Sequence, residues 1–305
     1  MSNYEICTDP CKRHDFVLLF DVADGNPNGD PDAGNLPRVD PETMQGLVTD
    51  VCLKRKVRDY IDLVSDGGDG KEIYIQNKGI ALNTQHERAY TALKMKSTGS
   101  KQKREDVDKT RAWMCANFID VRLFGAVMTT GINCGQVRGP FQLTFARSID
   151  PVIPLDLSIT RIAVTKPEDA VALSGEGDDE KSSGKQTEMG RKALLPYGLY
   201  RGAGFFSPKF AADTGVSKED MKLVWDALIN AWDTDHSASR GMMSCRGLYV
   251  FTHENPLGNA PAHILFDKIQ IPEIGDAKAP RKFSDYAVSV DEKMPEGVKL
   301  TRLVG

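Results

Sequence analysis

The most constraining feature of this chain is a short apolar run that stops at a long polar loop. The run DFVLLFDV, from Asp15 to Val22, has the length and composition of a buried β-strand. The next 17 residues, from Asp24 to Asp40, are rich in Gly, Pro, Asn and Asp. A loop longer than about 12 to 15 residues in a compact domain usually has a function or is disordered. We therefore expect the strand to open the core and the loop to carry function.

The loop from Asp24 to Asp40 permits three interpretations. A calcium site is suggested by the offsets of Asp24, Asn26, Asn28, Gly29, Asp30 and Asp32. However, the twelfth position is Asn35 instead of a bidentate Glu, and a strand precedes the loop where a calcium hand needs a helix. A tight turn made of standard turn residues is the structural alternative. Backbone amides in a Gly- and Asn-rich loop also suit phosphate oxygens, which favours an anion-binding loop.

An amphipathic helix is predicted directly after the loop. Its apolar face would be formed by Leu53, Val57, Ile61 and Val64, and Gly67 and Gly68 would end it. Another face carries three cations, Lys54, Arg55 and Arg58. An isolated charge stripe is often only a solvated helix face. Next to a loop with free amides, the same stripe suits a sugar-phosphate strand.

The rest of the chain predicts an alternation of helices and strands. We expect one helix over Trp113 to Met128, and another that begins at a capping box formed by Ser217 and Asp220 and buries Met221, Trp225, Leu228 and Trp232. Strands are expected at Gln136–Ile149 in the central sheet, Leu157–Val164, Lys192–Tyr200, Cys245–His253 and Ile264–Ile271. Gly70 to Arg111 is expected to be an insertion with a mobile tip, and Ser174 to Thr187 a disordered hairpin tip.

The order of these elements is strand, helix, strands, helix, strand. It predicts a ferredoxin-like α+β sheet, the architecture also used by RNA recognition motifs. The segment Arg246 to Tyr249 only echoes the aromatic signature of those motifs, so base stacking on the sheet is not assumed.

Composition excludes several classes of protein. The longest apolar run, around Phe16 to Phe20, is far shorter than the ~20 residues of a membrane span, and the N-terminus has no secretory apolar region. The six cysteines show neither zinc-ligand nor disulfide spacing. We therefore predict a soluble cytoplasmic protein. The net charge of −4 permits only a local basic surface.

No catalytic motif stands out. The five histidines lack metal-ligand spacing, no nucleophile elbow is present, and the Gly202, Gly204 pair lacks the rest of a dinucleotide fingerprint. Gly184 and Lys185 are followed by Gln186, so a phosphate-binding P-loop is absent. A single histidine acting as an RNA-cleaving base stays open. We expect a protein that works by binding, with no cofactor and no metal.

The same residues resemble a known family. The block DFVLLFDVADGNPNGDPDAGNLPRVDPETMQGLVTDVCLKRKVRDY, from Asp15 to Tyr60, is similar to the repeated backbone subunit of the type I-C CRISPR Cascade complex, the Cas-seven (Csd-two) family. Further matches are DVRLFGAVM, QVRGPFQ, SITRIAV and MGRKALLPYGLYRGAGFFSP. Together they cover most of the chain.

The resemblance implies one elaborated domain shaped like a hand. Its palm would be ferredoxin-like, its fingers would lie at residues 70–117 and its thumb hairpin at residues 158–197. Copies would polymerise along one CRISPR RNA, with each thumb reaching the next copy, and would present the guide for pairing with target DNA. The implied partners are CRISPR RNA, target DNA through the guide, neighbouring copies, and the handle-binding, large and small Cascade subunits.

The resemblance also implies which residues contact RNA. Backbone contacts would come from Asn26, Asn28, Arg38, Thr49, Lys54, Arg55, Arg58 and Arg138, and thumb contacts from Met189, Arg191 and Lys192. The acidic thumb tip, Glu176 to Lys185, would stay mobile or face a protein. Type III relatives cleave target RNA with a loop aspartate, so Asp24, Asp30 and Asp32 keep a nuclease alternative open.

Overall fold

Strand β1 (His14–Gly25) lies at the centre of an antiparallel sheet. It pairs with β10 (Glu188–Phe206) on one side and with β11 (Met242–His253) on the other. The full order is β14 (Val298–Val304), β11, β1, β10, β8 (Ala146–Pro151) and β4 (Gln45–Val48), while β7 (Phe141–Leu143) and β9 (Leu155–Arg161) also pair with β10. This computed structural model describes residues 3–68, 70–99, 101–161, 163, 188–274 and 279–305.

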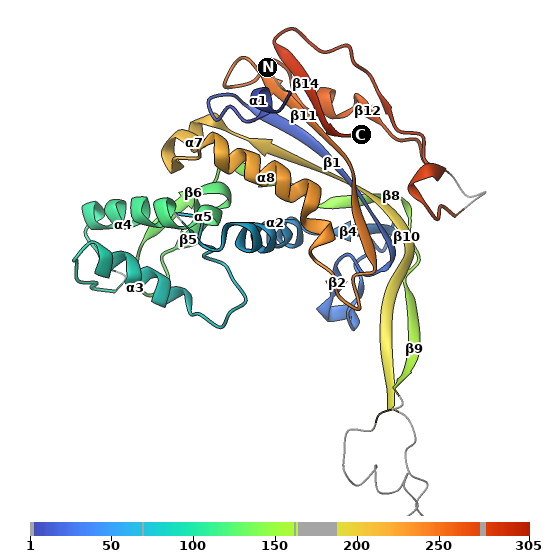
Figure 1. The fold of residues 1–305 in the computed structure, drawn as a ribbon, viewed down its shortest axis with the longest axis horizontal. Helices are drawn as coiled ribbons and strands as arrows, with labels where there is room; N and C mark the ends of the chain where they lie inside the picture. Colours follow the sequence, from blue (N-terminus) through green and yellow to red (C-terminus); the bar gives the residue numbers. More distant parts are fainter. Residues whose placement is uncertain (1–2, 69, 100, 162, 164–187, 275–278) are drawn as a thin grey trace, which may run out of the picture.

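Two helices cover one face of the sheet, which we call the front face (Figure 1). They are α2 (Asp50–Ser65) and α8 (Lys218–Asn230). Alternate residues of β1 point to them, so Phe16, Leu18 and Phe20 are fully buried in one cluster with residues of both helices. Phe16 meets Trp225 edge to face, with ring centroids 5.1 Å apart. The chain order β1, α2, β8, β10, α8, β11 confirms the expected alternation, and the fold is a mixed α+β fold with an antiparallel sheet.

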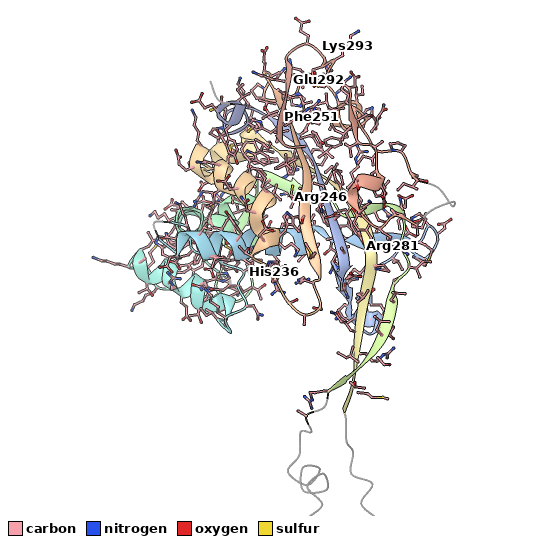
Figure 2. The ribbon with its side chains drawn as sticks, turned by 45° about the vertical axis from the view of Figure 1, so that its right-hand side comes forward. His236, Arg246, Phe251, Arg281, Glu292 and Lys293 are labelled. Carbon is pink, nitrogen blue, oxygen red and sulfur yellow. The ribbon has the colours of Figure 1, made fainter. Side chains whose placement is uncertain are left out.

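The C-terminal segment covers part of the opposite face, the rear face. It contains α9 (Ala262–Phe266), β12 (Ile269–Gln270), η3 (Phe283–Asp285) and β13 (Ser289–Val290). Leu265 and Ile269 pack there against Val17 and Phe251. Arg246, labelled in Figure 2, donates a 2.8 Å hydrogen bond to Asp21, and its guanidinium lies 5.4 Å from the centroid of the Phe283 ring. Of the strand expected at Ile264–Ile271, only β12 forms, and the first residues, through Phe266, are helical, because a short apolar run does not distinguish the two states.

A helical lobe, residues 70–138 without 100, lies beside the sheet (Figure 1). It holds α3 (Leu82–Ala92), α4 (Arg104–Asn117), α5 (Ile119–Phe124), β5 (Gly125–Met128) and β6 (Gly135–Arg138). A second cluster that includes Tyr90, Met114 and Phe118 forms its own core. The insertion expected at Gly70 to Arg111 therefore contributes residues to a packed core.

Two expected elements are broken in this lobe. The helix expected through Met128 ends at Asn117 and begins again as α5, because Phe118 between the two helices has an extended backbone. It then gives way to strand β5 at Gly125, where φ is +77°. The strand expected over Gln136–Ile149 is divided into β6, β7 and β8, and β6 pairs with β5 outside the central sheet. Pro140 lies at the break and has no N–H for a ladder.

The expected long hairpin is confirmed as β9 and the first part of β10, and it projects from the body of the protein (Figure 1). The expected disordered tip, Ser174 to Thr187, and the interpretation of Glu176 to Lys185 lie outside the described residues. Shorter elements are α1 (Asn3–Cys7), β2 (Gly29–Asp30), η1 (Pro31–Ala33), β3 (Leu36–Pro37), α7 (Pro208–Thr214) and η2 (Ala231–Asp233). In the described part of the chain, no helix has the length and apolar character needed to cross a membrane.

The expected capping box of α8 is confirmed and gives a stability prediction. The Ser217 hydroxyl accepts from the Asp220 amide at 3.1 Å, and the Asp220 carboxylate accepts from the Ser217 amide at 3.0 Å. Ser217→Ala leaves the Asp220 amide without its cap, so we expect the free energy of unfolding to fall by about 1 kcal/mol in urea titrations. Ser237→Ala, at an exposed serine outside any helix cap, is the matched control and should change it by less than about 0.5 kcal/mol.

Candidate nucleic-acid interface

The loop from Asp24 to Asp40 is itself folded. Its middle forms a small antiparallel pair, with Gly29 opposite Pro37 and Asp30 opposite Leu36, and η1 lies between them. Gly34 and Asn35 take left-handed φ values of 62° and 63°, which close the turn. Several amides expected to be free are used inside the loop: Asn35 donates to Asp30 and Arg38 donates to Asn28. The loop is thus a compact lobe with fewer open amides than an irregular cradle.

Asn28 fastens this lobe to the start of α2. Its Oδ1 accepts from the Thr49 amide at 3.0 Å and from the Thr49 hydroxyl at 3.1 Å. Thr49 is also the N-cap of α2, where its hydroxyl oxygen accepts from the Cys52 amide at 3.2 Å. The two residues therefore position the loop beside the positive end of the α2 dipole.

Asn26 lies deeper, at the root of the loop. Its side chain is only 3% exposed, and its amide group donates to the Asn35 carbonyl at 2.8 Å. Its backbone amide donates to the Ser239 carbonyl at 2.7 Å. These contacts make Asn26 a residue that holds the loop in place.

The carboxylates of the loop are partly engaged. Asp30 lies 3.3 Å from the Arg38 guanidinium, and it also accepts from the Asp32 amide at 3.2 Å. In the part of the chain that the structure describes, no group of three or more His, Cys, Asp or Glu side chains is arranged to hold a metal ion. The calcium-like spacing of the sequence therefore corresponds to an Asx turn and an ion pair.

The three expected cations of α2 have different environments. Arg58 is 11% exposed and pairs at 2.8 Å with Asp120, which is 1% exposed and also accepts from the Tyr74 and Ile75 amides. Lys54, 14% exposed, pairs with Asp50 at 3.0 Å. Arg55 is 58% exposed and pairs with Asp59 at 3.3 Å. The expected outer stripe is therefore wrong at Arg58, which α5 covers, and it is clearly exposed only at Arg55.

The apolar face of α2 also departs from the expectation. Leu53, Val57 and Ile61 are buried as predicted, but Val64 is 50% exposed. Lys56 takes a place on the buried face instead, where it pairs with Asp235 and lies 5.4 Å from the centroid of the Trp232 ring.

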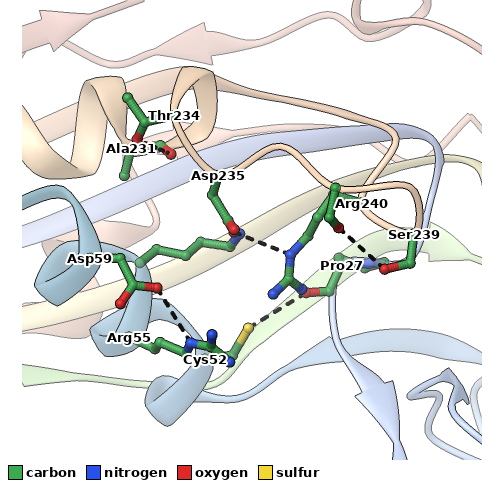
Figure 3. A network of polar contacts seen from close by, with 11 residues as sticks. Pro27, Cys52, Arg55, Asp59, Ala231, Thr234, Asp235, Ser239 and Arg240 are labelled. Atoms are coloured by element: carbon green, nitrogen blue, oxygen red, sulfur yellow. Dashed lines mark hydrogen bonds and ion pairs between the residues drawn. The ribbon is translucent and has the colours of Figure 1, made fainter. Parts of the chain in front are cut away.

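A loop that sequence reasoning missed lies over the start of α2 (Figure 3). It comprises residues 234–241, and its Asp235 is paired with both Lys56 and Arg240, the latter at 3.2 Å. Cys52 Sγ lies 3.5 Å from the Pro27 carbonyl nearby, and burial raises the pKa of that thiol. A signal was present in the sequence, because Lys56 falls among the apolar positions of α2 and a buried lysine needs a carboxylate.

The remaining expected residues lie elsewhere. Arg138 is exposed at the end of β6, with its guanidinium 4.2 Å from the centroid of the Phe210 ring of α7. Met189 and Arg191 are 77% and 79% exposed on the projecting hairpin, where Arg191 pairs with Asp156 of β9. Lys192 is half-buried opposite Leu157. The structure thus brings the loop residues and the start of α2 together, and it places Arg138 and the hairpin residues in two separate groups.

Comparison with known proteins shows a family through one family model that matches most of this chain. The family described as "CRISPR-associated protein Cas7" matches residues 12–291. A CRISPR-associated protein Cas7 from Haloferax volcanii is 28% identical over 244 residues, which span 72% of this chain and 64% of that relative's length. A solved chain of a CRISPR RNA-guided surveillance complex, pre-nicking, is 11% identical with a TM-score of 0.47, covering 78% of each chain. Another CRISPR RNA-guided surveillance complex gives 14% identity and a TM-score of 0.46, covering 87% of this chain and 78% of that one.

The burial of the α2 cations predicts opposite roles for two arginines. Arg58→Ala leaves the Asp120 carboxylate buried without its cation, so we expect a loss of about 3 to 5 kcal/mol in the free energy of unfolding. Arg55→Ala removes an exposed pair on the same helix and should cost less than about 1 kcal/mol. Urea titrations of both variants test the assignment, and equal losses would contradict it.

Proposed function

This chain belongs to the Cas7 family of CRISPR-associated proteins, and from that membership we propose that it is a non-catalytic backbone subunit that binds CRISPR RNA in a type I-C Cascade effector. The observation that carries the proposal is the extent of the family match. It runs from residue 12 to residue 291 and so includes the loop, helix α2 and the projecting hairpin. The resemblance of the block from Asp15 to Tyr60 supports the type I-C assignment.

We describe the central sheet with α2 and α8 as a ferredoxin-like, RRM-like palm. Its four inner strands lie in the order β11, β1, β10, β8, and the helices follow the first and third of them along the chain. Residues 70–117 are proposed as fingers and residues 158–197 as the thumb. The C-terminal segment packs on the rear of β1 and β11, so the guide is proposed to lie along the loop and α2.

We propose that the protein contacts the sugar-phosphate backbone of the RNA. Arg55 is exposed nearly two turns beyond the helix N-cap, and Arg38 and Lys54 lie in the adjoining loop and in the second turn. Asn28 and Thr49 join the loop to the N-terminus of α2, and a helix N-terminus favours phosphate. Contacts of this kind position a strand without reading its bases. Specificity would then come from guide pairing with target DNA.

The hairpin is proposed to link copies along the guide. Met189, Arg191 and Lys192 lie on its β10 strand, paired with β9. Because the hairpin projects from the body (Figure 1), we propose that one copy places them on RNA held by its neighbour. Arg138, stacked on Phe210, is proposed as a further contact. The handle-binding, large and small Cascade subunits are the other proposed partners.

The proposal predicts that the purified protein carries RNA. We expect small RNA of defined length to co-elute with it. Replacing Lys54 and Arg55 with Ala should weaken guide binding about equally for all guide sequences and lower the salt slope of log K by about 0.7 for each phosphate that is no longer neutralised. Lys299→Ala, at an exposed lysine of edge strand β14, is the matched control. Losses of affinity that depend on guide sequence would refute a backbone grip.

The nuclease alternative gives a separate prediction. Asp30 is engaged with Arg38 and the Asp32 amide, which leaves its carboxylate poorly placed to bind a metal. We therefore expect guide-loaded protein with Mg²⁺ or Mn²⁺ to leave a complementary RNA intact on a denaturing gel. Cleavage that is lost in Asp24→Ala or Asp32→Ala would establish the catalytic alternative instead.

A further inference from the structure

A groove of about 360 Å³ opens on the rear face of the sheet, where the C-terminal segment leaves β8 and β10 uncovered. We call it the rear groove. Its floor is formed by these two strands, and its lining includes Phe145, Arg147, Ile149, Arg201, Ile271 and Glu273. This volume is at the lower end of the ~300 to 1,000 Å³ typical of ligand sites. The groove is on the opposite face of the sheet from α2, and it meets the proposed guide-binding surface only at Asp40, the last residue of the loop, which pairs with Arg147.

Two arginines occupy opposite positions on neighbouring strands of the groove. Arg147 of β8 and Arg201 of β10 are direct partners in the antiparallel register. Like charges directly opposite each other destabilise a sheet. Their neighbours only partly relieve this, since Arg147 pairs with Asp40 at 2.8 Å while Arg201 donates to the Phe266 carbonyl at 2.5 Å. Among the described residues Arg201 forms no ion pair; burial lowers the pKa of its guanidinium, and the nearby charge of Asp267 offsets this only in part.

An exposed aromatic ring lies beside this pair of cations. Phe145 precedes β8 by one residue and is 53% exposed. Of the large apolar side chains exposed on the described residues, it is the only aromatic one. Its neighbour Ala146 is buried in the front-face core, which places Phe145 and Arg147 on the rear side of the strand.

We propose that the rear groove binds an unpaired stretch of single-stranded nucleic acid. A phosphate that contacts both guanidiniums would supply a counter-charge, and the planar fork of arginine matches its oxygens. The adjacent base would stack on Phe145, as bases do on aromatic side chains in sequence-tolerant sites. The carboxylates of Glu273 and Asp40 repel an anion, so the region of the groove that favours a phosphate is limited to the space around Arg147 and Arg201. The site therefore takes a short segment of a strand that is not held by the guide surface.

The test uses the full chain after saturation with guide RNA. A labelled oligothymidine of about 16 nucleotides, unable to pair with the guide, is titrated and its fluorescence anisotropy is measured. The double variant Phe145→Ser/Arg147→Glu changes two half-exposed side chains, so it should fold, and we expect it to weaken oligothymidine binding by at least about fivefold. Leu257→Ser/Lys299→Glu makes the same kinds of change at exposed positions outside the groove and should bind as the unmodified protein does.

The outcomes separate this proposal from the proposed function. Guide RNA content is measured in the same samples, so a loss of guide binding in the unmodified protein would count against the function and not against the groove. Absence of oligothymidine binding to guide-loaded protein, or equal binding by the groove variant, overturns the proposal. If the groove variant instead changes only the association between copies in sedimentation, the groove is a protein interface and the proposal is likewise overturned.

Discussion

The structure depends on burying both faces of strand β1. A strand whose two faces are covered must be apolar at successive positions, and from Phe16 to Phe20 every side chain is fully buried. Phe16, Leu18 and Phe20 contribute to the core under the helices, while Val17 and Leu19 contribute to the core under the C-terminal segment. Because β1 pairs with β10 and β11 at once, its end is fixed on both sides, and the loop that follows leaves the sheet at one defined place.

That fixed exit explains why the loop and α2 work as one unit. Asn26 holds the root of the loop against residue Ser239, and Asn28 bonds the N-cap of α2. The helix in turn is held by the buried pairs of Lys56 with Asp235 and Arg58 with Asp120. The bond of Asn28 joins the loop to α2, and the other three contacts join the loop or α2 to segments far away in the sequence. The candidate surface is therefore held in place before a ligand binds, which reduces the entropy lost when a ligand orders it.

The sequence predicted elements whose signals are local. The run at β1, the apolar spacing of Leu53, Val57 and Ile61, and the Ser217 capping box all depend on neighbouring residues, and the structure contains each of them. Predictions failed where distant segments decide the outcome. The helical spacing predicts that Arg58 is exposed to solvent. In the structure Arg58 is buried against Asp120, and nothing near Arg58 in the sequence reveals this contact. The strand expected over Gln136–Ile149 is divided because Gly139 approaches the backbone of Phe124 too closely for a side chain and Pro140 follows it. The loop at residues 234–241 is far from the site in the sequence, and only the folded chain brings it next to Asn26.

The pairing of cations with carboxylates sets how this acidic chain can bind an anion. With a net charge of −4, it has few cations to spare, and Arg38, Lys54, Arg55 and Arg191 each already face an aspartate. A phosphate must therefore replace a carboxylate. For exposed pairs such as Arg55 with Asp59 the exchange costs little, since such pairs contribute about 0 to 1 kcal/mol. In the buried pair of Arg58 with Asp120, the same exchange would leave the Asp120 carboxylate buried without a partner. Arg58 is therefore expected to keep its ion pair with Asp120. Each copy then offers only a few exchangeable cations, and in the proposed function a firm hold on RNA comes from many copies acting along one strand.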